Sequence, residues 1–350
     1  MRLVTFSEIT CFKMCRLQWY YRYQLLLKSP FTYPYFRRWK WIHKIADQFY
    51  RGEYQNIEEA LKGYDLLTNE EMADIEQEIN SFSAKDISFS IDDVLHDRAM
   101  GKAMLEIYLR RAVEEDKKLG IEFIASEFYF ENPLATINDE GRLDTLRDDK
   151  GEMVAHAGLI DQIDRTKDRY FIRERKFPAS WTEDDIRMVA WDEQISLYVI
   201  GAMASGTFSD MEFGGAIYDA VCKASLKRKN VGKNGEESWE DFAERMRRDY
   251  KERPDRYFSR SIQYRSAIEL RKVEDDFHSA IADMFNPKIN IYRGARRGGM
   301  TFAVPCRSCS YKYGCFDESQ LSNFVVRENR HEELKDYSKS KGELNGTAAT

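Results

Sequence analysis

The chain has 350 residues, of which 43% are hydrophobic, and its formal net charge at neutral pH is -6. This length suffices for one elaborated domain or two modest ones with a buried core. The negative balance argues against a protein that coats nucleic acid through overall positive charge, although a local basic groove is compatible with it. No run of about 18 uncharged apolar residues occurs, and the start lacks the basic-then-apolar order of a signal peptide, so we predict a cytoplasmic protein without membrane contact.

Helical periodicity dominates the first third of the chain. Ser7 is a suitable N-cap for a helix that continues into the aromatic segment QWYYRY. Residues 38–80 and about 92–119 also carry apolar residues at helical spacing. We therefore predict a mainly helical N-terminal region over residues 1–120.

The middle of the chain changes to short alternating or apolar stretches that are divided by polar turns, which is typical of β-strands. The predicted strands cover residues 121–132, 152–164, 168–177 and 211–222. Between the last two, residues 186–204 have the pattern of one amphipathic helix. The sequence therefore predicts an α/β fold with a mixed central sheet that is flanked by helices.

The last third is more polar. Two charged helices are expected at roughly 237–251 and 261–285. Residues 326–350 are charged and then small and polar, which predicts a disordered tail. The predicted core region accordingly covers residues 121–325.

The most informative segment is GLIDQIDRTKDRYFIRERKF at residues 158–177. Asp161 would lie on the first strand of a hairpin, and Glu174 and Lys176 on the second. Because side chains alternate along a strand, Glu174 and Lys176 share one face and Arg175 points to the other. Two carboxylates and an ammonium group at the end of a sheet suit a Mg²⁺ site, because oxygen ligands hold the ion and leave a position open for phosphate.

Lys176 cannot itself bind a metal ion while it is protonated, because an ammonium group has no free lone pair. Its predicted task is to position or deprotonate the attacking water, or to stabilise charge on the phosphate. An exposed hairpin with ordinary salt-bridging charges is the alternative interpretation of these residues.

The order Asp161, Glu174, Lys176 resembles the PD-(D/E)XK nuclease superfamily. It is most similar to the branch that contains the nuclease domains of the RecBCD and AddAB helicase–nucleases and the small nucleases of CRISPR adaptation. The resemblance implies a restriction-endonuclease-like core in which Mg²⁺ or Mn²⁺ is held by His43, Asp161, Glu174 and the backbone carbonyl of Arg175.

The assignment of His43 depends on the segment WIHKIADQFYRGE at 41–53. This segment resembles the Gly-x-x-x-His-x-x-x-Glu-like element in which that branch carries its metal-binding histidine. Trp39 stands where relatives have a small residue, so the match is incomplete. His156 is the alternative, but it lies an odd number of residues from Asp161 on a predicted strand and would face the other side.

The same resemblance extends to residues around the proposed centre. Gln194 and Tyr198 match a Gln-x-x-x-Tyr helix motif that contacts DNA or supports the site. Glu127 resembles an acidic residue on the preceding strand, with a role beside the ligands or toward a second ion. Lys223 and Lys227 match a strand and basic loop that approach the DNA backbone. For each of them, ordinary packing or a solvated charge is the structural alternative.

The C-terminal segment PCRSCSYKYGC carries Cys306, Cys309 and Cys315. In a cytoplasmic protein such spacing suggests a metal or cluster site before disulfides. Together with one N-terminal cysteine, the triplet resembles the [4Fe–4S] pattern of the iron–sulfur members of the same branch. Four thiolates suit Zn²⁺ as well, so a zinc site is the alternative.

The fourth ligand is assigned to Cys15, because the segment CRLQWYYRY resembles the aromatic-rich helix that follows the ligand in relatives. Arg16 stands where relatives often have proline, and Cys11 is the alternative ligand. Cys222 lies alone on a predicted strand and is expected to be a buried small hydrophobe.

By resemblance, the protein is expected to be an exonuclease-like DNA nuclease that acts on single strands or duplex ends. The branch implies a role in recombination, repair or replication in a bacterial or phage-infected cell, with a helicase or recombination protein as a possible partner. The sequence leaves open a non-catalytic DNA-binding module with a nuclease fold, and a structural zinc protein.

Overall fold

The computed structural model describes residues 1–29, 34–81, 89–137, 143–229, 235, 237–286, 288–291, 306, 309–312, 314–315 and 317–334. The α-helices are α1 (Phe6–Met14), α2 (Arg16–Trp19), α3 (Pro34–Tyr50), α4 (Ile57–Ser81), α5 (Ile91–Leu119), α6 (Glu183–Val189), α7 (Glu193–Ala204), α8 (Trp239–Glu252), α9 (Pro254–Tyr257) and α10 (Ala267–Met284). Short helical turns are the π-helix η1 (Tyr20–Gln24) and the 3-10 helices η3 (Glu318–Asn323) and η4 (Glu332–Leu334). The strands are β1 (Arg2–Val4), β2 (Leu27–Lys28), β3 (Glu122–Pro133), β4 (Ala135–Ile137), β5 (Leu143–Thr145), β6 (Val154–Arg165), β7 (Arg169–Lys176), β8 (Glu212–Val221), β9 (Phe258–Tyr264) and β10 (Val325–Val326).

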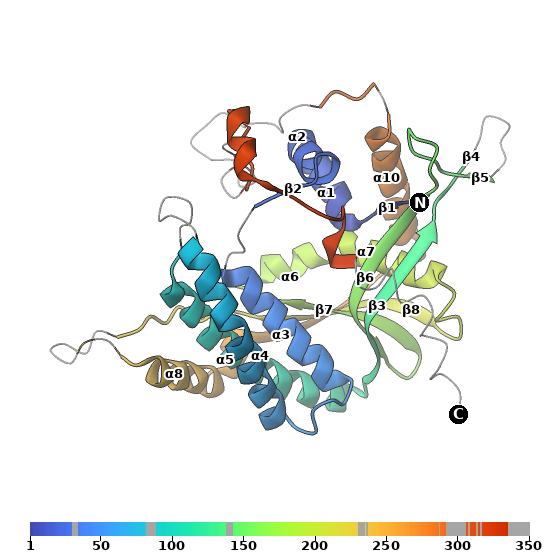
Figure 1. Ribbon diagram of the computed structural model, residues 1–350. Helices are drawn as coiled ribbons and strands as arrows, with labels where there is room; N and C mark the ends of the chain where they lie inside the picture. Colours follow the sequence, from blue (N-terminus) through green and yellow to red (C-terminus); the bar gives the residue numbers. More distant parts are fainter. Residues whose placement is uncertain are drawn as a thin grey trace.

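The central sheet of the described chain has six strands in the order β1-β6-β7-β8-β9, with β3 also paired to β6. β1 is parallel to β6 and β7 is parallel to β8, whereas the β6–β7 and β8–β9 pairs are antiparallel. The predicted hairpin of β6 and β7 is therefore present at the middle of the sheet. The mixed sheet with helices on both faces confirms the predicted fold class (Figure 1).

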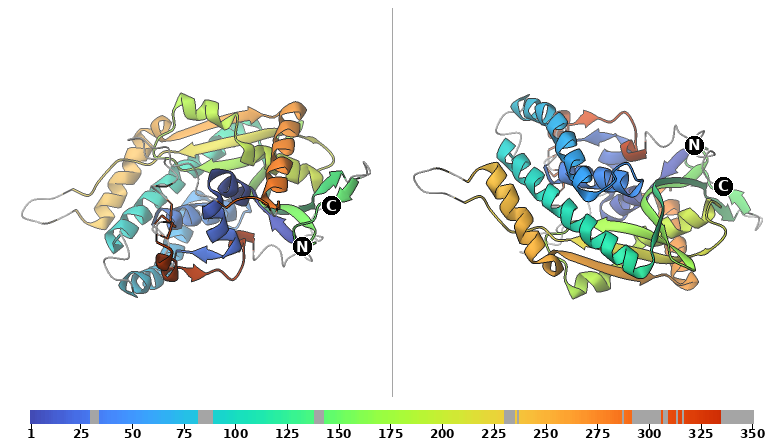
Figure 2. Two further views of the ribbon diagram at one scale, coloured as in Figure 1. Left: turned by 90° about the horizontal axis from the view of Figure 1, so that it is seen from above. Right: turned by 90° about the horizontal axis from the view of Figure 1, so that it is seen from below.

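Helices cover the sheet in two layers. α3, α4, α5 and α8 lie together on one face, where their apolar residues form one core cluster with the ends of β7 and β8 (Figure 2). α7 covers the other face and packs against β3, β6, β7 and β8. A third cluster joins β1, α1, α2 and α10, so the N-terminal helices are attached to the α7 side.

The longest helix, α5, illustrates how local sequence sets the elements. Ser90 caps its start and forms a reciprocal capping box with Asp93. Gly120 ends it with a φ of 63°, a left-handed conformation that glycine adopts without steric cost. Both signals are visible in the sequence, and the helix agrees closely with the predicted residues 92–119.

The prediction of one helix over residues 186–204 is wrong, because the chain forms α6 and α7 with a break between them. Asp192 caps the start of α7 by accepting a hydrogen bond from the Gln194 backbone N–H at 2.9 Å. The amphipathic pattern continues through the break, so periodicity alone conceals it. The break places a carboxylate at the start of α7.

The prediction of one helix over residues 261–285 is also wrong in its first part. Residues 258–264 form β9, which pairs with β8 at the edge of the sheet, and α10 begins only at Ala267. The sheet edge supplies backbone partners that a sequence pattern does not reveal. Arg260 on this strand is half of an ion pair with Asp219, which further fixes the strand.

The two ends of the described chain meet. β2 pairs with β10, and the Tyr311 hydroxyl donates a hydrogen bond to the Leu27 carbonyl at 2.6 Å. The predicted disordered tail over residues 326–350 is wrong for its first part, because Val326 belongs to β10, Glu332–Leu334 form η4, and buried His331 lies 3.2 Å from Glu8. Residues 335–350 lie outside the described residues, as does most of the loop after Lys229. Among the helices of the described chain, none is both long and apolar enough to cross a membrane.

Candidate active site

The predicted acidic residues lie where β6 and β7 separate. The β6–β7 pairing ends at Gln162 and Arg173, so Asp161 and Glu174 stand just beyond the last paired residues. Ile160 and Ile163 both pack in the cluster under α7, although strict alternation would place them on opposite faces. The alternation of β6 therefore changes phase around Asp161, at the point where the two strands diverge.

His43 reaches this fork from α3. Its Nδ1 lies 3.2 Å from a carboxylate oxygen of Asp161, and both side chains are partly exposed. Burial by itself lowers the pKa of His43, but the charge and hydrogen bond of Asp161 outweigh it and raise that pKa above its ordinary value. Burial alone would raise the pKa of Asp161, but His43 holds it below its usual range. The structure therefore brings together two residues that are 118 positions apart in the sequence.

Glu174 and Lys176 lie on the same face of β7, as predicted. The Lys176 Nζ donates a hydrogen bond to the Glu174 carboxylate at 2.6 Å. Burial raises the pKa of Glu174; Lys176 opposes the shift, and the charge of Asp161 adds to it. Burial would lower the pKa of Lys176, but Glu174 outweighs it and raises that pKa. Lys176 is therefore an ammonium ion at neutral pH in this arrangement.

Asp192 joins this group, and the sequence analysis did not single it out. Its carboxylate accepts a hydrogen bond from the Tyr218 hydroxyl at 3.0 Å, and Tyr218 pairs with Glu174 in the β7–β8 register. Its charge contributes to the raised pKa of both Glu174 and Lys176. Its N-cap position before an apolar helix is a signal for the start of α7, but not for a carboxylate that faces the site.

Arg175 points to the opposite face of β7, also as predicted, and is fully buried there. It donates hydrogen bonds to the Tyr108 hydroxyl at 3.0 Å, to the Asp47 carboxylate at 2.7 Å and to the Gln162 side chain. Asp47 lies one helical turn after His43 on α3. Arg175 therefore ties the helix that carries His43 to the strand that carries Glu174 and Lys176.

Glu127 lies opposite Asp161 in the β3–β6 register and has a φ of 51°. A non-glycine residue in this left-handed region is uncommon, and such strain often occurs at functional sites. Its carboxylate lies 3.6 Å from a guanidinium nitrogen of Arg51. Glu127 thus flanks the acidic centre, but in this arrangement its charge partner is an arginine.

His156, the alternative metal-binding histidine, lies in the core and away from the fork. Its ring packs against Phe130 and Phe277, with ring centres 4.9 and 4.7 Å apart. Burial lowers the pKa of His156 to about 3. The geometry therefore favours His43 as the histidine of the site.

The remaining predicted site residues are spread around the fork. Tyr198 packs edge-on against Phe130 and lies close to Gly158, where an added Cβ would come within 3.1 Å of the Tyr198 ring. Gln194 is half-buried at the start of α7. Lys223 lies at the end of β8, where its backbone N–H donates a hydrogen bond to the Pro178 carbonyl at 3.0 Å.

Lys227 is exposed, four residues further along the chain than Lys223. Burial lowers the pKa of Lys223, and the Arg38 guanidinium lowers it further. Because β7 and β8 are parallel and Lys176 pairs with Ala220, Lys223 lies at the same edge of the sheet as Lys176. Lys227 belongs to the loop that follows β8.

The donor groups at the fork satisfy one another: His43 pairs with Asp161, and Lys176 pairs with Glu174. Within the described residues, no group of three or more histidine, cysteine, aspartate or glutamate side chains is arranged as a metal site. Their chemistry nevertheless fits Mg²⁺ or Mn²⁺, because two carboxylates and an imidazole are suitable ligands. The repulsion between Asp161 and Glu174 is the kind of interaction that a cation relieves.

The four predicted cluster ligands interact electrostatically. Burial raises the pKa of the Cys309 thiol, and the charges of Cys15, Cys306 and Cys315 raise it further. Cys15 is only partly buried and joins α1 to α2. Cys11, the alternative, is buried in the apolar cluster of α1 and α2, where burial raises its pKa to about 12. The charges of Cys15 and Cys309 also act on the Cys11 thiol, so both N-terminal cysteines lie near the C-terminal cysteines.

Cys222 is half-buried and packs against the core cluster under α3 and α5. Its backbone carbonyl accepts a hydrogen bond from the Tyr250 hydroxyl at 2.8 Å. This environment agrees with the expectation of a small hydrophobic residue.

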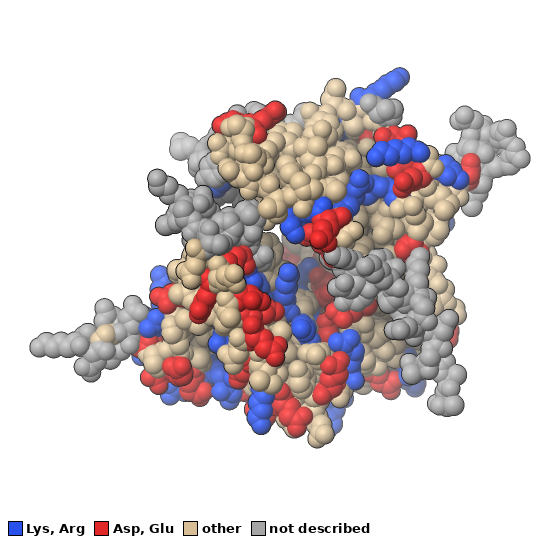
Figure 3. Space-filling model, in the orientation of Figure 1, with Lys and Arg blue, Asp and Glu red and all other residues tan. Residues whose placement is uncertain are grey.

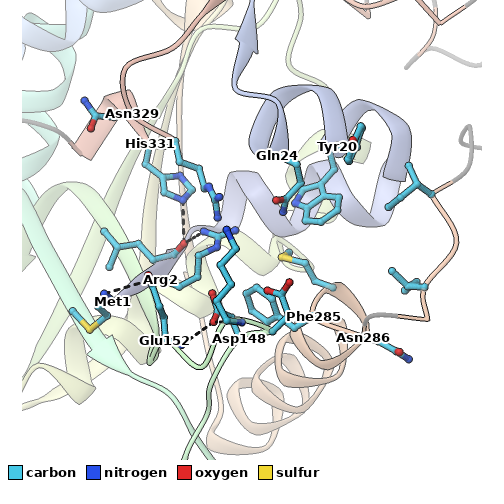
Figure 4. Close-up of a pocket in the computed structure, with 18 of the residues that line it drawn as sticks. Met1, Arg2, Tyr20, Gln24, Asp148, Glu152, Phe285, Asn286, Asn329 and His331 are labelled. Carbon is cyan, nitrogen blue, oxygen red and sulfur yellow. Dashed lines mark hydrogen bonds and ion pairs between the residues drawn. The ribbon is translucent and has the colours of Figure 1, made fainter.

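Two hollows in the described surface are lined by residues other than His43, Asp161, Glu174 and Lys176. The first has a volume of about 720 Å³ and lies beside β1, where Figure 4 shows Arg2 and His331 close together with Asn286 across from them. Its main charges are already paired, Arg2 with Glu8 and the Met1 amino group with Glu152. The second, of about 670 Å³, runs along α6 and includes Asp192.

A mixed α/β sheet with two carboxylates and a lysine at a strand fork defines a class of phosphodiester-cleaving cores. Residues 4–316 match the model of a family described as the PD-(D/E)XK nuclease superfamily, and the chain belongs to this superfamily. Its members are generally nucleases and commonly use Mg²⁺ or Mn²⁺. Membership of a nuclease family implies that the substrate is DNA. A comparison with curated proteins finds no match.

Proposed function

We propose that the protein is a metal-dependent DNA nuclease whose site consists of His43, Asp161, Glu174 and Lys176. The observation that carries this proposal is the convergence of these side chains at the fork of β6 and β7, with His43 3.2 Å from Asp161 and Lys176 2.6 Å from Glu174. The family match over residues 4–316 supports the same reaction class. An ordinary surface hairpin would not bring a histidine from α3 to the same point.

The three donors that would hold Mg²⁺ or Mn²⁺ are His43, Asp161 and Glu174, together with the backbone carbonyl of Arg175. A divalent cation in such a site supplies charge for the phosphate and lowers the pKa of a bound water. Asp161 and Glu174 provide the negative charge that attracts the ion, and burial of Glu174 strengthens that interaction.

Lys176 acts as a cation in this proposal. Because its pKa is raised by Glu174, it keeps its proton at neutral pH and suits stabilisation of negative charge on the phosphate. The same ammonium group can orient an attacking water by hydrogen bonding. A role as the general base would require loss of the contact with Glu174.

We infer that the substrate is a DNA single strand or a duplex end and that cleavage is exonuclease-like, in recombination, repair or replication, with a helicase or recombination protein as partner. The resemblance of the chain to the branch with helicase–nucleases supports this part. Gln194, Tyr198, Glu127, Lys223 and Lys227 are the proposed supporting or DNA-contacting residues.

We also propose that Cys15, Cys306, Cys309 and Cys315 bind a [4Fe–4S] cluster, with Zn²⁺ as the alternative occupant. The effect of Cys15, Cys306 and Cys315 on the Cys309 thiol supports this assignment. The meeting of β2 with β10 in the same region means that the group would join the two ends of the chain. Anaerobic purification with an absorption spectrum and assays for iron and zinc distinguishes the two occupants, and a protein with neither contradicts both.

The nuclease proposal is tested by digestion of end-labelled single- and double-stranded DNA with Mg²⁺ or Mn²⁺. We expect cleavage to fall at least about 1000-fold in Lys176→Ala and in Asp161→Ala, because each removes charge from the reacting centre. Melting curves check that both variants fold. DNA binding without cleavage under either ion would instead support a non-catalytic DNA-binding module.

A further inference from the structure

The basic segment at the start of α3 separates into two groups of cations. Arg37 is ion-paired with Glu78, and Arg38 is buried and ion-paired with Asp97. Lys40 and Lys44 are exposed, and neither forms an ion pair or hydrogen bond within the described part of the chain. The two arginines therefore form ion pairs within the fold, whereas the two lysines are available to a ligand.

Lys40 and Lys44 lie on the same side of α3 as His43. The opposite side of the helix is in the core, where Trp41, Ile42 and Ile45 are almost fully buried. Residues four apart on a helix are neighbours, so the two lysines form a short basic stripe. Figure 3 shows Lys and Arg side chains along the middle of the face on which Figure 1 draws α3, beside a hollow.

Aromatic side chains accompany this stripe. Phe36 is 49% exposed and Trp39 is 36% exposed, although large aromatic residues usually bury more of their surface. The Trp39 ring packs edge-on against Phe177, with ring centres 6.1 Å apart, and Phe177 in turn contacts the His43 ring. The exposed Trp39 ring is thus linked to the His43 ring of the proposed active site through the buried ring of Phe177.

We propose that this outer face of α3, formed by Phe36, Trp39, Lys40 and Lys44, binds the DNA strand that enters the active site. Lys40 and Lys44 contact phosphates, and Trp39 and Phe36 stack against unpaired bases. This inference rests on the proposed nuclease function and narrows its substrate to DNA with unpaired bases at the site, either a single strand or a frayed duplex end.

Charge and chemistry favour a nucleic acid strand over another occupant. The carboxylates that contact α3 have partners other than the two lysines: Glu78 pairs with Arg37, Asp97 with Arg38 and Asp47 with Arg175. Cations beside exposed aromatic rings are the combination that binds single strands, because phosphates and base faces recur along the same path. The stripe also ends at His43, where the scissile phosphate is expected.

The test measures binding, in a Lys176→Ala background that prevents cleavage, of a labelled oligothymidylate and of a blunt duplex by fluorescence anisotropy at several salt concentrations. We expect Lys40→Ala/Lys44→Ala to weaken binding of the single strand about tenfold and to reduce the salt slope by about 1.4. We expect Trp39→Ala to weaken binding of the single strand about tenfold and binding of the blunt duplex less than about twofold.

Lys62→Ala is the matched control, because Lys62 is an exposed lysine on the neighbouring helix α4. Unchanged affinity and salt slope in the double lysine variant would overturn the proposal, as would an equal loss in Lys62→Ala. Phe36→Ala replaces Trp39→Ala if the latter does not fold, since Phe36 is the more exposed ring. If the aromatic variant lost equal affinity for the duplex and for the single strand, the assignment of base stacking would be overturned.

Hydrolysis of bis(p-nitrophenyl) phosphate with Mn²⁺ separates this proposal from the nuclease function, because such a small phosphodiester does not reach the stripe. With Lys176 intact, the double lysine variant is expected to keep this hydrolysis while the KM for single-stranded DNA rises about tenfold. Loss of both activities would overturn the stripe as a separate binding surface. A wild type that binds DNA through α3 but hydrolyses neither substrate would contradict the nuclease function alone.

Discussion

The charged residues on the two faces of β7 differ in their role. On one face, Arg173 and Arg175 are fully buried and surrounded by carboxylates and tyrosines. On the other face, Glu174 and Lys176 point to the fork, where Lys176 is 28% exposed. One strand therefore holds a structural ion-pair network and a proposed reaction centre, separated only by the alternation of its side chains.

The difference between the faces lies in how their charges are satisfied. Arg173 contacts Asp164, Asp116 and Asp219, and Arg260 shares two of these carboxylates. Every charge of that network has a partner from another element, so it fixes α5 and β9 on the sheet. At the fork, three carboxylates, those of Asp161, Glu174 and Asp192, outnumber the two basic groups of His43 and Lys176. Repulsion between Asp161 and Glu174 therefore persists. Such unresolved charge is typical of a site that binds a ligand.

The largest effect is expected from Arg173→Met. Removing this guanidinium leaves Asp116 and Asp219 with Arg260 alone and buried Asp164 with no cation. Breaking such a network costs about 3–5 kcal/mol in the free energy of unfolding. Urea unfolding measures the loss. Lys176→Met is the control from the other face, with an expected change of about 1 kcal/mol and loss of cleavage. An Arg173 variant as stable as the wild type would break the comparison.

Asp47→Asn is expected to have an intermediate effect, on both the stability of the protein and its cleavage activity. It keeps the shape and a hydrogen-bond acceptor for Arg175 but leaves that buried guanidinium without its charge partner, which costs about 2 kcal/mol. Because Asp47 is one turn from His43, we also expect about a tenfold fall in kcat/KM per folded molecule. Unfolding and single-turnover cleavage are measured on the same preparation. Lower stability with unchanged cleavage would show that the two faces are independent.

The smallest effect is the pH dependence of Asp116. Burial alone would raise its pKa, but Arg173 and Arg260 outweigh it and hold the pKa below its usual range. A lowered folded-state pKa contributes stability above the unfolded value of about 3.9, and this stability is lost as pH falls through the folded value. The stability difference between wild type and Asp116→Asn should therefore be constant above about pH 5 and shrink below it, by about 1.4 kcal/mol for each unit of pKa shift.

Urea unfolding at a series of pH values from neutral to acid measures this difference. The comparison of two variants is needed because burial raises the pKa of neighbouring Asp164, which opposes the effect in the wild type alone. A difference that stays the same at neutral and acid pH would contradict the assignment of charge in the network.

The sequence predicted the hairpin of β6 and β7 well because the chemistry and the pattern coincide there. Alternation placed Glu174 and Lys176 on one face and Arg175 on the other, and the contacts of all three confirm it. The sequence did not reveal Asp192, because a helix cap looks the same whether or not its carboxylate faces a site. It also missed β9, whose pairing with β8 depends on the sheet edge.

Local sequence by itself determined the strands of the hairpin, the caps of α5, and which residue types could bind metal or phosphate, since these follow from alternation and from the donor chemistry of single side chains. The resemblance indicated His43, but only the tertiary structure brought its ring to 3.2 Å from Asp161, and only it decided that the arginines of the α3 segment are engaged while its lysines are exposed. The physical reason is that both outcomes depend on partners far away in the chain, which packing brings together and a sequence pattern does not encode.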